Sequence, residues 1–287
     1  MQNRKALAWR IGMIGWRMVR LVLLLGLAFL IIRPFLDKIL QAFMHPDDLL
    51  DATVQFIPRH LSIYYWKTAL QSLQLSQTLS NTLLLSGVGG AIQMMVSTSV
   101  GYGLARYRFR GNRLLFVCVI IMMIVPPQVY SIAQYLMFRS LHITDTVLPI
   151  FVLSIGGLGL KQGLYIYLMK SFFEGLPHDL ESAAYIDGAG NFRTFFSVML
   201  PNAVSIMAIV FLFSFCWQWT DTTMPDLYFS STLVFANVIP TLGLQVPMDG
   251  KIIQNAACIL ILIPLFLPFI FSQKMLVKSI ASTGLAN

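Results

Sequence analysis

Charged residues are scarce in this chain of 287 residues: Asp, Glu, Lys and Arg make up only 11%, against 57% hydrophobic residues. Soluble domains carry about 25% charged residues, so the composition excludes an ordinary soluble protein. Several apolar stretches have the ~20 residues that a helix needs to cross a bilayer. Because backbone groups in lipid must be hydrogen-bonded within their own segment, the sequence predicts an all-α integral membrane protein.

The residues of most metal, redox and nucleotide sites are also few. Cys118, Cys216 and Cys258 lie far apart in apolar stretches, which is typical of small buried side chains rather than disulfides or metal ligands. The four histidines are scattered without ligand spacing. The chain has no GxxxxGK[S/T] phosphate loop, and no clustered acids or nucleophile of a membrane-embedded enzyme. We therefore expect no catalytic residue, metal or cofactor in this chain.

The apolar stretches predict six spans, no separate soluble domain, and one membrane domain over residues 1–287. The run LVLLLGLAFLII follows basic residues and resembles a signal peptide, but no small-x-small cleavage site follows it, so an uncleaved first span is favoured. We expect short helices in segment 37–70 and a loop over 222–251. The predicted spans are residues 14–36, 76–105, 114–137, 147–169, 202–221 and 252–272.

The basic residues gather at the ends of the spans and set the orientation of the chain. With the N-terminus inside, thirteen of the twenty Lys and Arg residues lie on the inner side and six on the outer side, while Lys161 falls within a span. This bias predicts that both termini are cytoplasmic. The net charge of +8 is explained by these span ends, so it favours a lipid bilayer and not a nucleic acid as partner.

The polar module ESAAYIDGAG, residues 181–190, lies in the second predicted cytoplasmic loop. Pro177 suits the first turn of a helix, and Asp179 and Glu181 suit its positive end. Gly188 is typical of a helix stop with positive φ. A second short helix then leads to Leu200 and Pro201. The pattern predicts a helix–turn–helix over 177–201, with small residues on an exposed elbow.

This loop resembles the signature of binding-protein-dependent ABC importer permeases, in which Glu-Ala-Ala, three residues, Gly and nine residues precede Ile-x-Leu-Pro. Here Ser182-Ala183-Ala184 and Gly188 are followed at the same spacing by Val198-Met199-Leu200-Pro201. The stretches NTLLLSGVGGAIQMMVSTSVGYGLARYRFRGNRLLF and QKMLVKSIASTGLAN resemble the carbohydrate-type permeases. The C-terminal stretch is similar to the second permease of maltose-type systems.

The resemblance implies a bacterial or archaeal inner-membrane protein that moves a sugar by alternating access. It implies a second, homologous permease, two ATPase subunits that carry ATP and Mg, and an extracellular solute-binding protein. It also implies that loop 177–201 is a coupling helix seated on an ATPase. The residues expected to dock there are Glu181, Ser182, Ala183, Ala184, Asp187, Gly188, Ala189 and Gly190.

One departure concerns the docking contact. Ser182 occupies the position where the family usually has Glu, and Glu181 lies one residue earlier. A shift of one residue turns a side chain by about 100° around a helix, so Glu181 does not directly replace the usual carboxylate. The resemblance therefore leaves docking in place but puts its charged contact in question.

Three residues are candidates for the translocation path. Lys161 lies well inside the fourth predicted span, where an ammonium group either faces an aqueous cavity or forms a structural ion pair. Trp217 and Trp219 either stack on a sugar ring or belong to an interfacial aromatic belt. Asn81, Gln93, Gln128 and Gln134 either line the path or join helices.

The sequence thus predicts the permease subunit of an ATP-driven sugar importer. One alternative within transport is another solute, such as a glycerol phosphoester or a polyamine. A secondary transporter is disfavoured, because such proteins usually show internal halves and intramembrane acids.

Overall fold

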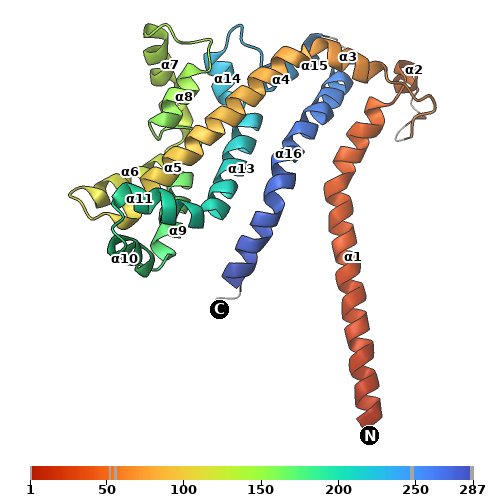
Figure 1. The fold of residues 1–287 in the computed structure, drawn as a ribbon. Helices are drawn as coiled ribbons and strands as arrows, with labels where there is room; N and C mark the ends of the chain where they lie inside the picture. The colour runs from red at the N-terminus through yellow and green to blue at the C-terminus, as the bar shows by residue number, and fades with distance from the viewer. Residues whose placement is uncertain (1, 52, 55–56, 246–248, 285–287) are drawn as a thin grey trace. The chain divides into compact units, whose positions relative to one another are not determined.

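The computed structural model describes residues 2–51, 53–54, 57–245 and 249–284. Almost all of these residues are helical, and in the described ranges the one extended pairing is an isolated bridge between Met44 and Leu61. Figure 1 shows the order of the helices along the chain. The all-α fold class predicted from the sequence is confirmed.

The elements follow one another in short steps. They are α1 (Gln2–Ala42), α2 (Pro46–Leu50), α3 (Tyr64–Ser72), α4 (Leu75–Leu83), η1 (Leu84–Val88), α5 (Gly89–Arg106), α6 (Asn112–Ile124), η2 (Pro127–Val129), α7 (Ser131–Ser140), α8 (Leu148–Ile155), α9 (Gln162–Gly175), α10 (Asp179–Ile186), α11 (Asn191–Thr194), η3 (Phe195–Met199), α12 (Leu200–Asn202), α13 (Val204–Thr220), α14 (Thr223–Tyr228), α15 (Phe235–Gln245) and α16 (Gly250–Gly284).

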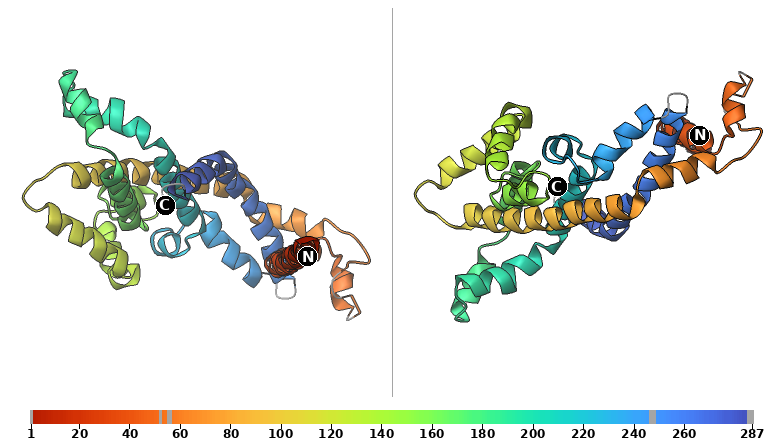
Figure 2. Two further views of the ribbon diagram at one scale, coloured as in Figure 1. Left: turned by 90° about the horizontal axis from the view of Figure 1, so that it is seen from below. Right: turned by 90° about the horizontal axis from the view of Figure 1, so that it is seen from above.

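Among the residues that the structure describes, three helical stretches are long and apolar enough to cross a membrane: Gly15–Ala42, Leu75–Arg106 and Gly250–Ile270. A fourth is possible if Asn191–Asn202 and Val204–Thr220, bent by 75°, form one span. In Figure 2, α4, η1 and α5 run on as one continuous helix. The number of six spans stays a prediction.

The third and fourth predicted spans are interrupted helices. The third breaks between α6 and α7, where Pro126 and Pro127 end the hydrogen-bond ladder. The fourth breaks between α8 and α9, where Gly157 adopts φ +77°. A hydropathy window averages over such breaks, so the apolar runs alone gave no sign of them.

The segment 222–251 is not a loop, which corrects the prediction made from its proline and glycine content. It contains α14 and α15. The Asp221 carboxylate caps α14 by accepting from the backbone N–H groups of Thr223 (3.3 Å) and Met224 (2.9 Å). Pro225 lies in the first turn of α14, where a missing N–H leaves no bond unmade.

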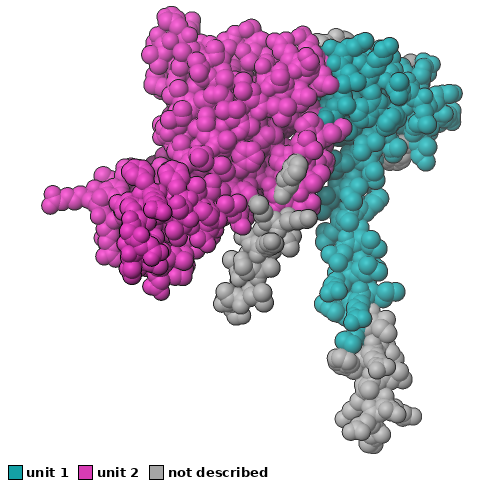
Figure 3. All heavy atoms as spheres, viewed as in Figure 1, with its two compact units in different colours: residues 1–72, 242–260 teal, residues 73–241, 261–287 magenta. Residues whose placement is uncertain are grey.

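The chain divides into two compact units, which Figure 3 draws in different colours: residues 1–72 with 242–260, and residues 73–241 with 261–287. In the first unit, Asp48 holds the chain after α2 by accepting from the His60 backbone N–H at 2.8 Å. Lys38 donates to Asn255 at 2.6 Å, and Tyr65 is fully buried. The prediction of one membrane domain stays a prediction.

The second unit is built on α5 and α9, which approach closely at Gly101. A Cβ atom at this glycine would lie 2.6 Å from the Met169 Cβ and 2.8 Å from the Lys170 backbone nitrogen, so no other residue fits. Tyr102, Tyr165 and Phe173 form a buried cluster beside this crossing. In Figure 1, α10 and α11 lie at one end of this unit, while α7 and α14 lie at the other.

Candidate coupling loop and translocation path

The module predicted at 177–201 is a helix–turn–helix. Helix α10 begins at Asp179, two residues after Pro177, and carries Asp179 and Glu181 in its first turn. It ends at Ile186, and Gly188, just after the C-cap residue Asp187, adopts φ +80°. The N–H of Gly188 bonds to the Tyr185 carbonyl (3.0 Å) and that of Ala189 to the Ala184 carbonyl (2.9 Å), which are the two bonds of a Schellman C-cap. The predicted stop with positive φ at Gly188 is confirmed.

The predicted docking residues divide between two faces of α10. Glu181 and Ala184 are each only 7% exposed and face the body of this chain. Ser182, Ala183, Asp187, Gly188 and Gly190 are exposed, and Ala189 is half-buried. Ser182 Oγ donates at 3.2 Å to the carbonyl of His178, the N-cap residue of the same helix. The exposed elbow is thus formed by the small residues and not by Glu181, and docking itself stays a prediction.

Large apolar side chains extend this exposed surface beyond the predicted residues. Ile186 is 86% exposed and Phe192 is 83% exposed. The chain then returns through α11, η3 and α12, with Met199 fully buried in the Tyr102 cluster. The module is therefore anchored on one side, while its elbow presents apolar and small residues outward. Exposed apolar residues gathered at one place are typical of a protein contact.

The structure brings together two of the three path candidates. Lys161, with φ +57°, lies at the break before α9. Its Nζ is 5.1 Å from the ring centroid of Trp217 on α13, a cation–π contact. Trp219 is only 2% exposed and stacks on Phe215, with ring centroids 5.3 Å apart. In this structure Trp219 is a packing residue, whereas the exposed Lys161 and Trp217 form a pair.

A hollow of 760 Å³ lies between the end of α6, the segment before α7 and the break before α9. Its lining is mostly apolar but includes Gln128, Tyr130, Gln134 and Lys161. Within the described residues, Gln134 Oε1 is buried there without a hydrogen-bond partner. The hollow has the mixed apolar and polar lining that is typical of small-molecule sites.

Gln93, by contrast, joins two helices, and Asn81 joins α4 to the segment before α15. Gln93 is fully buried between Ser154 of α8 and Ser214 of α13, and it bonds to both hydroxyls. Asn81 donates to the Leu233 carbonyl at 2.9 Å. Gln162 bonds to backbone groups at the break in the fourth predicted span. Its side chain donates to the Ser154 carbonyl (2.8 Å) and accepts from the Gly159 N–H (2.8 Å). The Gln162 amide thus bonds to backbone groups where the helical ladder is interrupted.

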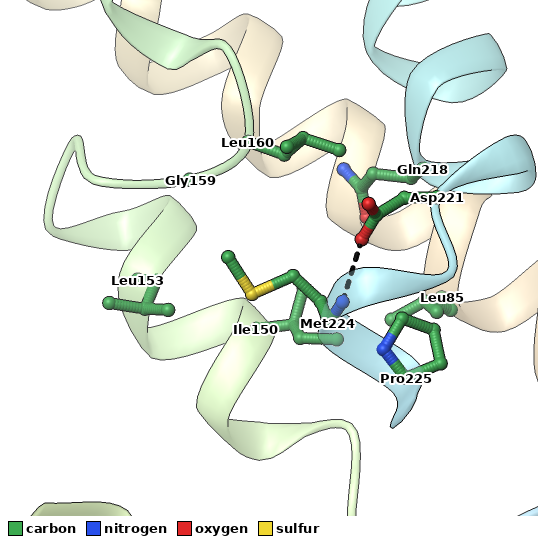
Figure 4. A pocket seen from close by; sticks show the side chains of 9 residues that line it. All are labelled: Leu85, Ile150, Leu153, Gly159, Leu160, Gln218, Asp221, Met224 and Pro225. Atoms are coloured by element: carbon green, nitrogen blue, oxygen red, sulfur yellow. Dashed lines mark hydrogen bonds between the residues drawn. The ribbon is translucent and has the colours of Figure 1, made fainter. Parts of the chain in front are cut away.

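A small cavity of about 20 Å³ lies beside this network, and Figure 4 shows the nine residues that line it. Asp221 and Gln218 are its polar members, and in Figure 4 the Asp221 carboxylate is turned to the Met224 backbone N–H, at 2.9 Å. The volume suits roughly one water molecule. Among the described residues, no group of three or more His, Cys, Asp or Glu side chains is arranged to hold a metal ion.

Comparison with known proteins assigns the chain to a family. Residues 97–282 match the profile described as binding-protein-dependent transport system inner membrane component. This chain belongs to that family. It is 25% identical to a probable ABC transporter permease protein of Pyrococcus horikoshii, with 93% of this chain and 91% of that protein covered.

Two similar proteins have names that give a substrate. A galactooligosaccharides transport system permease protein of Bacillus subtilis is 26% identical, over 92% of this chain and 93% of its own length. A maltodextrin transport system permease protein of Streptococcus pneumoniae is 27% identical, over 91% and 92%.

A solved structure shares the fold of this inner membrane component. It is the crystal structure of a bacterial ABC transporter involved in the import of the acidic polysaccharide alginate. The TM-score is 0.76, with 90% of this chain and 95% of that chain covered. At 18% identity the likeness shows the fold alone.

Sequence reasoning on this inner membrane component missed the residues that hold α10. Tyr102 donates to Glu181 Oε1 at 2.8 Å, and Arg106 Nε lies 3.6 Å from Glu181 Oε2. Arg106 was interpreted only as one of several basic residues that set orientation. The pairing joins residues 75 positions apart in the sequence, and no local pattern reveals it.

Proposed function

We propose that this chain is the transmembrane permease subunit of an ATP-driven ABC importer for a sugar or oligosaccharide. The observation that carries the proposal is the shape of α10 and its turn: a short helix outside the apolar spans, anchored on one face and exposed at a small-residue elbow. Family membership and the named relatives support the same conclusion. The alternatives of a glycerol phosphoester or a polyamine have no comparable support.

The proposed assembly has four kinds of partner. A second, homologous permease completes the path, two ATPase subunits bind ATP and Mg, and an extracellular solute-binding protein delivers the sugar. This chain has no phosphate loop, so ATP hydrolysis is assigned to the ATPases and not to the permease. Closure of the ATPases would move α10 and rock the helices between inward-open and outward-open states.

We place the docking surface on the exposed face of the elbow. Ser182, Ala183, Asp187 and Gly188 form it, and the exposed Ile186 extends it. A neutral hydrogen bond from Ser182 is worth about 1 kcal/mol, against about 1.5–3 for a charge-assisted one. Shape and apolar contact therefore contribute more to docking here than charge does.

The proposed topology has six spans and two cytoplasmic termini. Helices α8 and α9 have 8 and 14 residues, or roughly 12 and 21 Å, so together they cross a hydrocarbon core of about 30 Å. We expect the break between them to be tolerated at membrane depth because Gln162 bonds to the Ser154 carbonyl and the Gly159 N–H. The same reasoning makes α6 and α7 one interrupted span.

The proposal is tested by cross-linking α10 to the ATPase. Ala183→Cys is introduced in a background without Cys118, Cys216 and Cys258, and the permeases are co-expressed with the ATPase. We expect a bifunctional thiol reagent to join Ala183→Cys to an ATPase cysteine at the contact. Leu136→Cys, at an exposed position of α7 at the other end of this unit, is the matched control. Cross-linking from position 136 and not from 183 would contradict the docking assignment.

The substrate class is tested with the cognate solute-binding protein. We expect oligosaccharides to raise its thermal midpoint, while glycerol phosphoesters and polyamines leave it unchanged. Stabilisation by a polyamine alone would overturn the assignment to carbohydrate and leave the importer assignment standing.

A further inference from the structure

We propose that Tyr102, Arg106 and Glu181 form a latch that makes α10 and the cytoplasmic end of α5 move as one body. The inference rests on the proposed coupling role of α10 and adds the route by which its motion enters the membrane. Arg106 and Glu181 are positioning residues in this account, because they touch neither the sugar nor ATP.

The Glu181 carboxylate is held from two sides. Its side chain is 10% exposed, although it lies in the first turn of a helix at the surface. Oε1 accepts from the Tyr102 hydroxyl at 2.8 Å, and Oε2 lies 3.6 Å from Arg106 Nε. A carboxylate turned away from water in this way requires its charged partner, since an unpaired buried charge is strongly unfavourable.

Arg106 joins three segments through one guanidinium group. It is the last residue of α5, and its side chain is 2% exposed. Nη2 donates to the Leu176 carbonyl at 2.7 Å, in the linker between α9 and α10. Nη1 lies 2.9 Å from His178 Nδ1, and because a guanidinium can only donate, this ring nitrogen accepts. Arg106 thus ties the end of α5 to the linker and to α10 at once.

The phenol ring of Tyr102 fixes the latch in the core of the unit. Tyr102 is 4% exposed and packs against Phe173 of α9 and Phe195 of η3, with ring centroids 5.2 and 4.8 Å apart. Its hydroxyl therefore has little freedom to leave Glu181. The latch is supported by both neighbouring helices and is more than a contact between two flexible side chains.

The helix that the latch holds is long and apolar enough to cross a membrane. The continuous stretch Leu75–Arg106 has 32 residues, or about 48 Å of helix. Its close crossing with α9 at Gly101 leaves no room for the two helices to slide. A displacement of α10 is therefore passed to α5 and α9 together, and through Gln93 to the polar network at the centre of the unit.

The first test compares transport with ATP hydrolysis in the reconstituted complex. We expect Glu181→Gln and Arg106→Met to lower transport per ATP by about tenfold, within the range of mutations that alter coupling, while the ATPase stays bound and active. Tyr102→Phe keeps the ring and removes one hydrogen bond, so its loss should be smaller. Arg106→Lys keeps the positive charge but loses the several N–H donors of the guanidinium. Its transport per ATP should lie between that of Arg106→Met and that of the unmodified protein.

Glu174→Gln is the matched control. Glu174 also forms an ion pair, with Lys170, but its side chain is 50% exposed on α9. Removing this exposed pair should leave transport per ATP unchanged. Equal losses in Glu174→Gln and Glu181→Gln would show a general effect of charge and would overturn the latch.

The second test measures the motion itself. Spin labels are attached at Arg108→Cys and Asp179→Cys, two exposed positions on either side of the latch, in a background without the native cysteines. The distance between the two labels then reports whether α5 and α10 move relative to each other. We expect one narrow distance that does not change through the ATP cycle, and a broad distribution in the additional presence of Glu181→Gln. A distance that changes on ATP binding in the intact latch would overturn the inference. If the unmodified complex shows no ATP-driven transport, the proposed function fails instead.

Discussion

Gly188 is the residue on which the turn after α10 depends. Its φ of +80° lies in the left-handed region, and a Cβ atom there would meet nothing within 4 Å. Substitution therefore costs backbone strain and not a clash within the chain. We expect Gly188→Val to destabilise the turn by about 1–3 kcal/mol and to reduce substrate-stimulated ATP hydrolysis, because the elbow is displaced.

Gly188→Asn serves as the control for that substitution, since Asn tolerates the left-handed region better than a β-branched residue does. It should keep more than half of the stimulated hydrolysis. Equal activity of the unmodified, Asn and Val complexes would show that the contact with the ATPase lies elsewhere.

Lys161 is the residue whose surroundings most directly report an aqueous path. It is exposed at the break before α9 and lines the 760 Å³ hollow. In a background without native cysteines, Lys161→Cys should react with a small hydrophilic thiol reagent, and its rate should change when ATP is trapped. Ser154→Cys, at a fully buried position nearby in α8, should stay unlabelled. If neither cysteine reacts in any state, Lys161 is a structural lysine held by Trp217.

Helix α10 has an outward and an inward face. Substitutions on the outward face should impair binding of the ATPase, and those on the inward face should impair the stability of the permease. Ser182→Ala should reduce transport by less than about tenfold, because it removes one neutral hydrogen bond. Ala183→Arg should block co-purification of the ATPase and leave the permease folded. Ala184→Arg should instead lower the thermal stability of the permease, since Ala184 is buried against its own chain. Loss of the ATPase with Ser182→Ala alone would mean that α10 is rotated from this assignment.

The loop between α7 and α8 is tied to the segment before α15 by Asp145. Its carboxylate accepts from the N–H groups of Ser230 and Ser231 at 2.8 Å and of Thr232 at 2.9 Å, and from the Ser231 hydroxyl. Hydrogen bonds from Ser231 and its neighbours hold the pKa of Asp145 well below its ordinary value. A carboxylate whose pKa is lowered by folding stabilises the fold in full above its unfolded-state pKa of about 4. This contribution to stability is lost as the pH falls from there through the folded-state pKa.

Asp145→Asn should therefore raise amide hydrogen exchange at residues 230–232 at neutral pH, because the neutral amide is a weaker acceptor and adds N–H groups that face other donors. Thr146→Ala, at the exposed neighbouring position, is the control and should leave exchange at 230–232 unchanged. Equal protection in Asp145→Asn and the unmodified protein would contradict the role given to this carboxylate.

For the whole molecule, the features predicted from the sequence were those encoded locally. The apolar runs gave helices, and the DGAG stretch gave the stop at Gly188. Pro126 and Gly157 were visible in the sequence as residues that can break a helix. The bonds that Gln162 makes to Ser154 and Gly159 around the second break were not visible there. The latch could not be predicted from the sequence, because Arg106 and Glu181 meet only when the packing around Tyr102 places α5 and α10. Tertiary pairing, not local propensity, decided the inward face of α10.

The central claim is that this chain moves a sugar only within an ATP-driven assembly. The measurement that tests it most directly is uptake of labelled oligosaccharide into proteoliposomes, with and without ATP. We expect uptake only when this chain is reconstituted with a second permease, the ATPases, the solute-binding protein and ATP. Sugar uptake by the purified chain alone, at the same rate without ATP, would contradict the account.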